Sequence, residues 1–67
     1  MNPFNIGDIG MIVDVSSLGG EQAKRLQHIG EVIDTIRIAV GDERVRLQFI
    51  DGYRTGNLKI HRVAKIE

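Results

Sequence analysis

Apolar and polar residues alternate along most of this chain, in short runs separated by turn-forming residues. The clearest run covers residues 44–50 and ends at Asp51-Gly52, a dipeptide typical of tight turns. Successive side chains of a strand point to opposite faces of a sheet, so this run predicts a strand with one buried face. Its inward residues are Val45, Leu47 and Phe49, and its outward residues are Arg44, Arg46 and Gln48.

Four further strands follow from the same kind of pattern, over residues 10–15, 30–40, 58–60 and 63–66. Neither parity of the 30–40 run is purely apolar, which predicts a β-bulge or a strong bend near Asp34-Thr35. Gly41-Asp42-Glu43 is typical of a hairpin turn, and the short gap after Ile60 fits a single tight helical turn. The predicted core consists of Val13, Val32, Ile38, Val45, Leu47, Phe49, Leu58, Ile60 and Val63.

The segment between the first two strands, residues 16–27, does not alternate. Ser16-Ser17 and Gly19-Gly20 are typical of loops, whereas residues 21–27 are good helix formers. A helix this short is marginal alone, because its nucleation consumes most of the gain from its hydrogen bonds. We therefore expect a long loop between strands 1 and 2, and whether it holds one or two helical turns stays open.

Together these elements predict a single all-β domain over residues 1–67, a five-stranded antiparallel barrel. The pattern resembles the SH3-like small barrels, including the KOW and Tudor-like groups. The residues that carry the resemblance are Gly7-Asp8, Ile29-Gly30-Glu31-Val32, Val45–Phe49 with Asp51-Gly52, Leu58 and Val63. It covers nearly the whole chain and implies a fold that mostly binds partners, but it implies no particular activity.

The composition argues against catalysis and metal binding. The chain has no cysteine and two histidines, which excludes thiolate chemistry and an all-histidine zinc site. No close spacing of histidine and carboxylate residues supports a mixed zinc site. The sequence also contains neither a nucleophile elbow nor a phosphate-binding loop. We therefore expect a protein that is not an enzyme and uses neither a metal nor a cofactor.

A local similarity to the plasmid-borne, trimethoprim-resistant dihydrofolate reductases leaves this expectation unchanged. Their active pore is lined by Val-Gln-Ile-Tyr followed by Pro-Val-Ala, and this chain has Leu58-Lys59-Ile60-His61 followed by Arg62-Val63-Ala64. Lys59 and His61 replace the Gln and Tyr of that family, and His28-Ile29-Gly30 replaces its Trp-Gln-Gly. We therefore expect no reductase activity.

Residues 1–5 lack the basic and apolar regions of a signal peptide, and no apolar run approaches the ~18 residues that span a bilayer. These features predict a cytoplasmic protein with no membrane partner. Nine basic and nine acidic residues give a net charge of zero, which provides no global attraction to nucleic acid. The bases nevertheless concentrate after residue 36, and a basic face there would contact phosphates. KOW-like RNA binding is therefore our alternative function, with Arg44, Arg46, Arg54, Lys59 and Arg62 as its residues.

Our first hypothesis is a small non-enzymatic module that acts as an accessory or regulatory factor by binding a protein partner. Neutral charge, the absence of catalytic motifs and a long adaptable loop favour it. The candidate protein-binding residues are Leu18, Lys24, Arg25, Leu26 and Tyr53. Association into a homo-oligomer would also cover an open strand edge in such a small domain.

Overall fold

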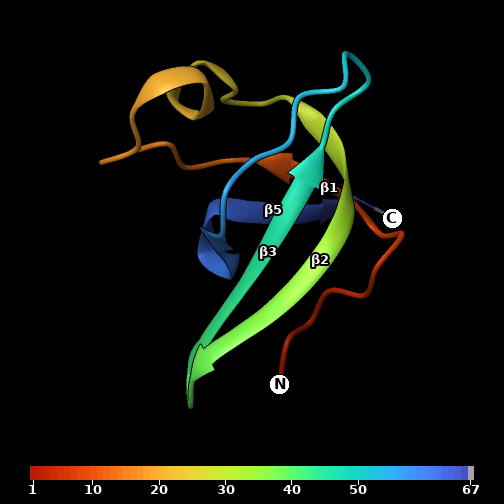
Figure 1. Ribbon diagram of the computed structural model, residues 1–67, viewed down its shortest axis with the longest axis vertical. Helices are drawn as coiled ribbons and strands as arrows, with labels where there is room; N and C mark the ends of the chain where they lie inside the picture. Colours follow the sequence, from red (N-terminus) through yellow and green to blue (C-terminus); the bar gives the residue numbers. More distant parts are fainter. Residues whose placement is uncertain (67) are drawn as a thin grey trace.

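The computed structural model describes residues 1–66 and contains one antiparallel sheet of five strands (Figure 1). The strands are β1 (Ile9–Ile12), β2 (Ile29–Ala39), β3 (Asp42–Gln48), β4 (Leu58–Lys59) and β5 (Val63–Ile66). Two short 3-10 helices join them: η1 (Gly20–Lys24) precedes β2, and η2 (Ile60–Arg62) connects β4 to β5. The predicted all-β class and the five antiparallel strands are therefore confirmed.

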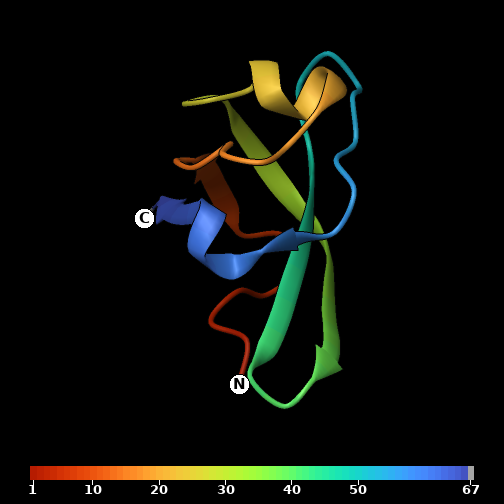
Figure 2. The same ribbon diagram turned by 90° about the vertical axis from the view of Figure 1, so that its left-hand side faces the viewer.

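The strand order is β4-β3-β2-β1-β5, so the last strand returns to pair with the first. No pairing joins β4 to β5 within residues 1–66, and the sheet is open. The predicted closure into a barrel is therefore not confirmed. β2 and β3 form a long curved hairpin whose tip extends beyond the other strands in both views (Figures 1 and 2).

A small hydrophobic core lies on the inner face of this curved sheet. Its buried side chains are Phe4, Ile12, Val32, Val45, Leu47, Phe49, Leu58 and Val63. On β3 the predicted alternation is confirmed, because the inward residues from Val45 to Phe49 are buried and the residues between them are half-buried. Phe4, which the strand pattern does not include, brings the N-terminal segment against this core.

The predicted inward face of β1 was wrong by one residue. Ile12 is fully buried, whereas Val13 is 43% exposed. The inward position before Ile12 is Gly10, which is paired with Gly30 on β2. A Cβ at Gly10 would lie 2.6 Å from the Val63 Cγ1 atom, so this position requires glycine. A glycine adds no apolar side chain to the alternation, and the pattern therefore pointed to the opposite face.

Two positions of β2 also differ from expectation. The pairing register with β3 shifts between Val32 and Asp34, one residue before the predicted bend, and shifts again between Arg37 and Ala39. Ile38 was predicted to be in the core but is 55% exposed. The physical reason is position, since Ile38 is the second-last residue of β2, next to the turn that leads into β3.

Both short helices lie in the connections where the sequence allowed or predicted helical turns. η1 is one short 3-10 helix within the predicted loop, and η2 is the predicted turn between the last two strands. Ile60, predicted as the end of a strand and a core residue, instead begins η2 and is partly buried against the core. Its side chain borders the core because β4 is only two residues long and the chain turns immediately after Lys59.

Candidate protein-binding surface

A row of paired residues crosses the outer face of the sheet, on the side away from the core. Ile66 on β5 is paired with Ile9 on β1, and Ile9 is paired with Glu31 on β2. Glu31 is in turn paired with Gln48 on β3. Directly paired residues of antiparallel strands project from the same face, so these four side chains lie side by side on the surface.

A second row lies beside the first. Ala64, Met11 and Ile29 are paired across β5, β1 and β2, and Ile50, two residues beyond the end of β3, lines the same groove as Ile29. Ile29 is 55% exposed, and the side chain of Ile50 is fully exposed. Single exposed apolar residues are common on protein surfaces, but several gathered on one face mark an interaction site. We call Ile9, Ile29, Ile50 and Ile66 the isoleucine face.

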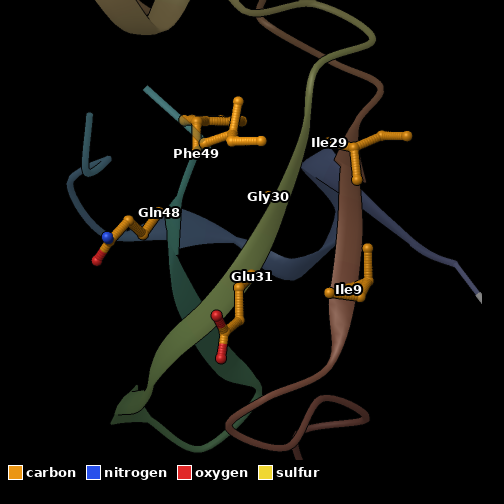
Figure 3. Close-up of a pocket in the computed structure, with 7 residues that line it drawn as sticks. Ile9, Ile29, Gly30, Glu31, Gln48 and Phe49 are labelled. Carbon is orange, nitrogen blue, oxygen red and sulfur yellow. The ribbon is translucent and has the colours of Figure 1, made fainter. Parts of the chain in front are cut away.

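An open groove runs through this face (Figure 3). Ile9 and Ile29 line it from neighbouring strands, Glu31 and Gln48 line it from β2 and β3, and Gly30 lies between them. A Cβ at Gly30 would lie 2.9 Å from the carbonyl oxygen of Gln48. That direction is toward the core, because Gly30 is buried and paired with the inward Gly10. On the outer face the groove has apolar walls, which include Ile50 and Phe49, and one carboxylate at its side.

Arg25 joins the loop before β2 to the turn after β3. Its guanidinium carbon lies 5.0 Å from the ring centre of Phe49 and 4.7 Å from that of Tyr53. The guanidinium donates hydrogen bonds to the carboxylates of Glu21 and Asp51. The hydrogen bond with Asp51 is the main cause that raises the pKa of Arg25 and lowers the pKa of Asp51.

This cluster determines what Arg25 is able to do. Arg25 is only 7% exposed, and its guanidinium is already hydrogen-bonded to the carboxylates of Glu21 and Asp51. The guanidinium also lies over both rings, a contact that arginine commonly makes with aromatic side chains. Arg25 therefore stabilises the loop against Phe49 and presents little of its charge to a partner.

Of the other predicted protein-binding residues, one lies with Arg25 and three do not. Tyr53 belongs to the cluster, stacked on Phe49 with ring centres 6.2 Å apart, and is half-buried. Leu18 is partly buried against the core, whereas Lys24 and Leu26 are exposed near the end of η1. The structure thus brings Arg25 and Tyr53 together, and the isoleucine face is a different surface.

Four of the five predicted nucleic-acid-binding residues share the outer face of β3 and β4. Arg44 is paired with Lys59, and Arg54 forms a bridge with Gln48, which has the same strand parity as Arg44 and Arg46. Two of these cations are neutralised within the face. The Arg44 side chain forms an ion pair with Asp42, 3.0 Å away, and Arg46 with Asp34, 3.3 Å away.

Arg62, the fifth predicted residue, lies apart from this face. It belongs to η2, and its guanidinium donates hydrogen bonds to the backbone carbonyl oxygens of Asp14 and Ser16. It also lies 3.7 Å from the carboxylate of Asp14. Arg62 therefore fixes the start of the long loop, and the predicted basic face is smaller and less charged than the sequence suggested.

No protein-family model matches this chain, and no curated protein matches it significantly. Within residues 1–66, the metal-ligating side chains do not gather into a group of three or more. In the same range, both helices are single short turns, too short to cross a bilayer. The geometry of the surface is therefore the basis for a functional proposal.

The isoleucine face was missed in the sequence, although a signal for it is present. Ile9 and Met11 lie on one parity of β1, and the buried Ile12 lies on the other. Ile50 likewise follows directly after Phe49, the last inward residue of that run. Apolar residues at both parities indicate a strand with one face toward the core and a second apolar face toward solvent or a partner.

Proposed function

We propose that this chain is a small non-enzymatic binding module that docks a protein partner on its isoleucine face. The observation that carries the proposal is the row arrangement: three strands place exposed isoleucines on one outer face, around a groove. The partner is an apolar segment or surface whose side chains fill that groove. Water is then removed from aliphatic surface on both molecules, which is the main favourable contribution to such docking.

The fold supports the same kind of function. The return of β5 to β1, the turn glycines Gly41 and Gly52, and the short helix before β5 fit the SH3-like small barrels that the sequence resembles. We propose membership of that fold group, with the sheet open rather than closed. Small sheets of this kind offer little volume for a buried active site but a large outer surface for contacts.

Serine substitutions on the groove test the proposal. Ile9→Ser and Ile29→Ser remove exposed aliphatic surface without touching the core, so the fold should remain intact. Burying one isoleucine against a partner contributes about 1.5–3 kcal/mol, so each substitution should weaken binding by about 10- to 100-fold. Val40→Ser is the matched control, because Val40 is also exposed but lies at the hairpin tip.

The measurement begins with affinity purification from the native host, using the wild type and the three variants. A protein that the wild type and Val40→Ser retain, but the two isoleucine variants lose, is then purified and titrated by calorimetry. The proposal fails if retained proteins bind all four forms with equal affinity. Retention of nucleic acid in place of protein would instead favour the alternative on Arg44, Lys59 and their neighbours.

A further inference from the structure

The acidic residues of this protein differ in whether they have a basic partner. Seven of them form an ion pair within 4.0 Å: Asp8, Asp14, Glu21, Asp34, Asp42, Glu43 and Asp51. Within residues 1–66, Glu31 is the acidic residue that has no ion pair, and its carboxylate accepts no side-chain hydrogen bond there. This residue lines the groove of the isoleucine face.

The neighbours of Glu31 explain why it has no partner. In the row across the sheet it lies between Ile9 and Gln48. Arg54, the next residue along the row, donates a hydrogen bond from its Nε atom to the Oε1 atom of Gln48, 3.0 Å away. The nearest cation in the row is therefore held by an amide, and Glu31 stays exposed to water among aliphatic side chains.

A partner that covers the isoleucine face removes this water. A carboxylate that loses its hydration without gaining an ion pair or hydrogen bonds is strongly unfavourable, whereas a cation placed beside it restores the balance. From this, and resting on the function proposed above, we infer that the partner presents a lysine or arginine side chain flanked by aliphatic residues. The aliphatic residues fill the groove, and the cation pairs with Glu31.

The charge of Glu31 affects the specificity of binding more than its affinity. A partner with a neutral residue opposite Glu31 leaves the carboxylate unpaired, and one with an acidic residue adds repulsion. The net charge of the whole chain is zero, so the selectivity comes from this one local carboxylate and not from a general attraction for cations. Among peptides of equal apolar content, we expect a preference of about tenfold for the cationic peptide.

Selection from a random peptide library displayed on phage tests the inference without knowledge of the natural partner. The baits are the wild type, Glu31→Gln, Glu31→Lys and Ile29→Ser. Glu31→Gln keeps the size of the side chain and removes its charge, and Glu31→Lys reverses the charge. Both positions are exposed, and circular dichroism spectra of the four baits check that each is folded.

For the wild type we expect enrichment of peptides in which lysine or arginine lies among aliphatic residues, and for Ile29→Ser we expect that enrichment to disappear. Glu31→Gln should lose the basic preference but keep the aliphatic one, and Glu31→Lys should prefer peptides with Asp or Glu. Aliphatic peptides without a basic preference in the wild type would overturn this inference and leave the proposed function standing. Peptides that bind Ile29→Ser as well as the wild type, or no enrichment at all, would overturn both.

Discussion

Gly30→Ala tests the close approach of β2 to the end of β3 on the core side of the groove. The new Cβ would lie 2.9 Å from the carbonyl oxygen of Gln48 and 3.2 Å from two ring carbons of Phe49. A backbone oxygen has no rotamer by which to move away, and Phe49 is itself buried and stacked on Tyr53. β2 therefore has to shift away from β3.

The magnitude follows from two opposing effects. Overpacking of this kind costs about 1–3 kcal/mol, and replacing glycine by alanine recovers about 0.4–1 kcal/mol because the unfolded chain is less flexible. We expect Gly30→Ala to lower the free energy of unfolding by about 1–2 kcal/mol. Gly19→Ala is the matched control: Gly19 has an extended backbone, and a Cβ there meets nothing within 4 Å.

Urea unfolding, followed by circular dichroism and by Tyr53 fluorescence, measures both variants. Tyr53 is the single tyrosine of a chain without tryptophan, so its signal is specific. With a slope of about 1 kcal/mol per M for a small domain, the midpoint of Gly30→Ala should fall by about 1–2 M. The midpoint of Gly19→Ala should be unchanged or higher. If both variants shift the midpoint equally, or Gly30→Ala raises it, the proposed steric role of Gly30 is refuted.

Two further predictions concern charge. A hydrogen bond from Arg25 lowers the pKa of Asp51, so its contribution to stability is complete above about pH 4 and is lost as the pH falls further. Asp51→Asn should therefore make the stability, measured by thermal unfolding, less sensitive to pH below about 4, and an unchanged acid dependence would contradict this. For nucleic acid we expect weak binding that disappears near physiological salt, because Arg44 and Arg46 already have carboxylate partners. Sub-micromolar binding in fluorescence anisotropy that survives physiological salt, and is lost in the Arg44→Ala/Arg46→Ala double variant, would promote the nucleic-acid alternative.

The sequence was most informative where a strand has one buried and one exposed face. β3 comes nearest to such a strand: Val45, Leu47 and the following Phe49 were predicted as inward from alternation and are buried, and the residues between them are half-buried. In β1 the same rule failed, because Gly10 occupies an inward position without contributing an apolar side chain. In β2 the register shift after Val32 moves later residues to the other face, and alternation does not locate such a shift to the residue.

The candidate surface was harder to predict than the fold, because it depends on which strands become neighbours. Ile9, Ile29 and Ile66 are far apart in the sequence and meet only through the pairing of β1 with both β2 and β5. The burial of Arg25 was likewise not predicted from its polar loop, because it depends on two rings and the Asp51 carboxylate, which come from another part of the chain. Both outcomes are set by tertiary contacts that no local pattern records.

The pairing of β5 with β1 also determines when this protein is able to fold during its synthesis. The β2–β3 hairpin is built from residues close in sequence, so it forms early, whereas β1 must wait for residues 63–66. Until those residues have left the ribosome, the nascent chain exposes an unpaired strand edge together with Ile9 and the uncovered side of Ile12. The growing polypeptide is therefore most prone to aggregation while β5 has not yet emerged from the ribosome.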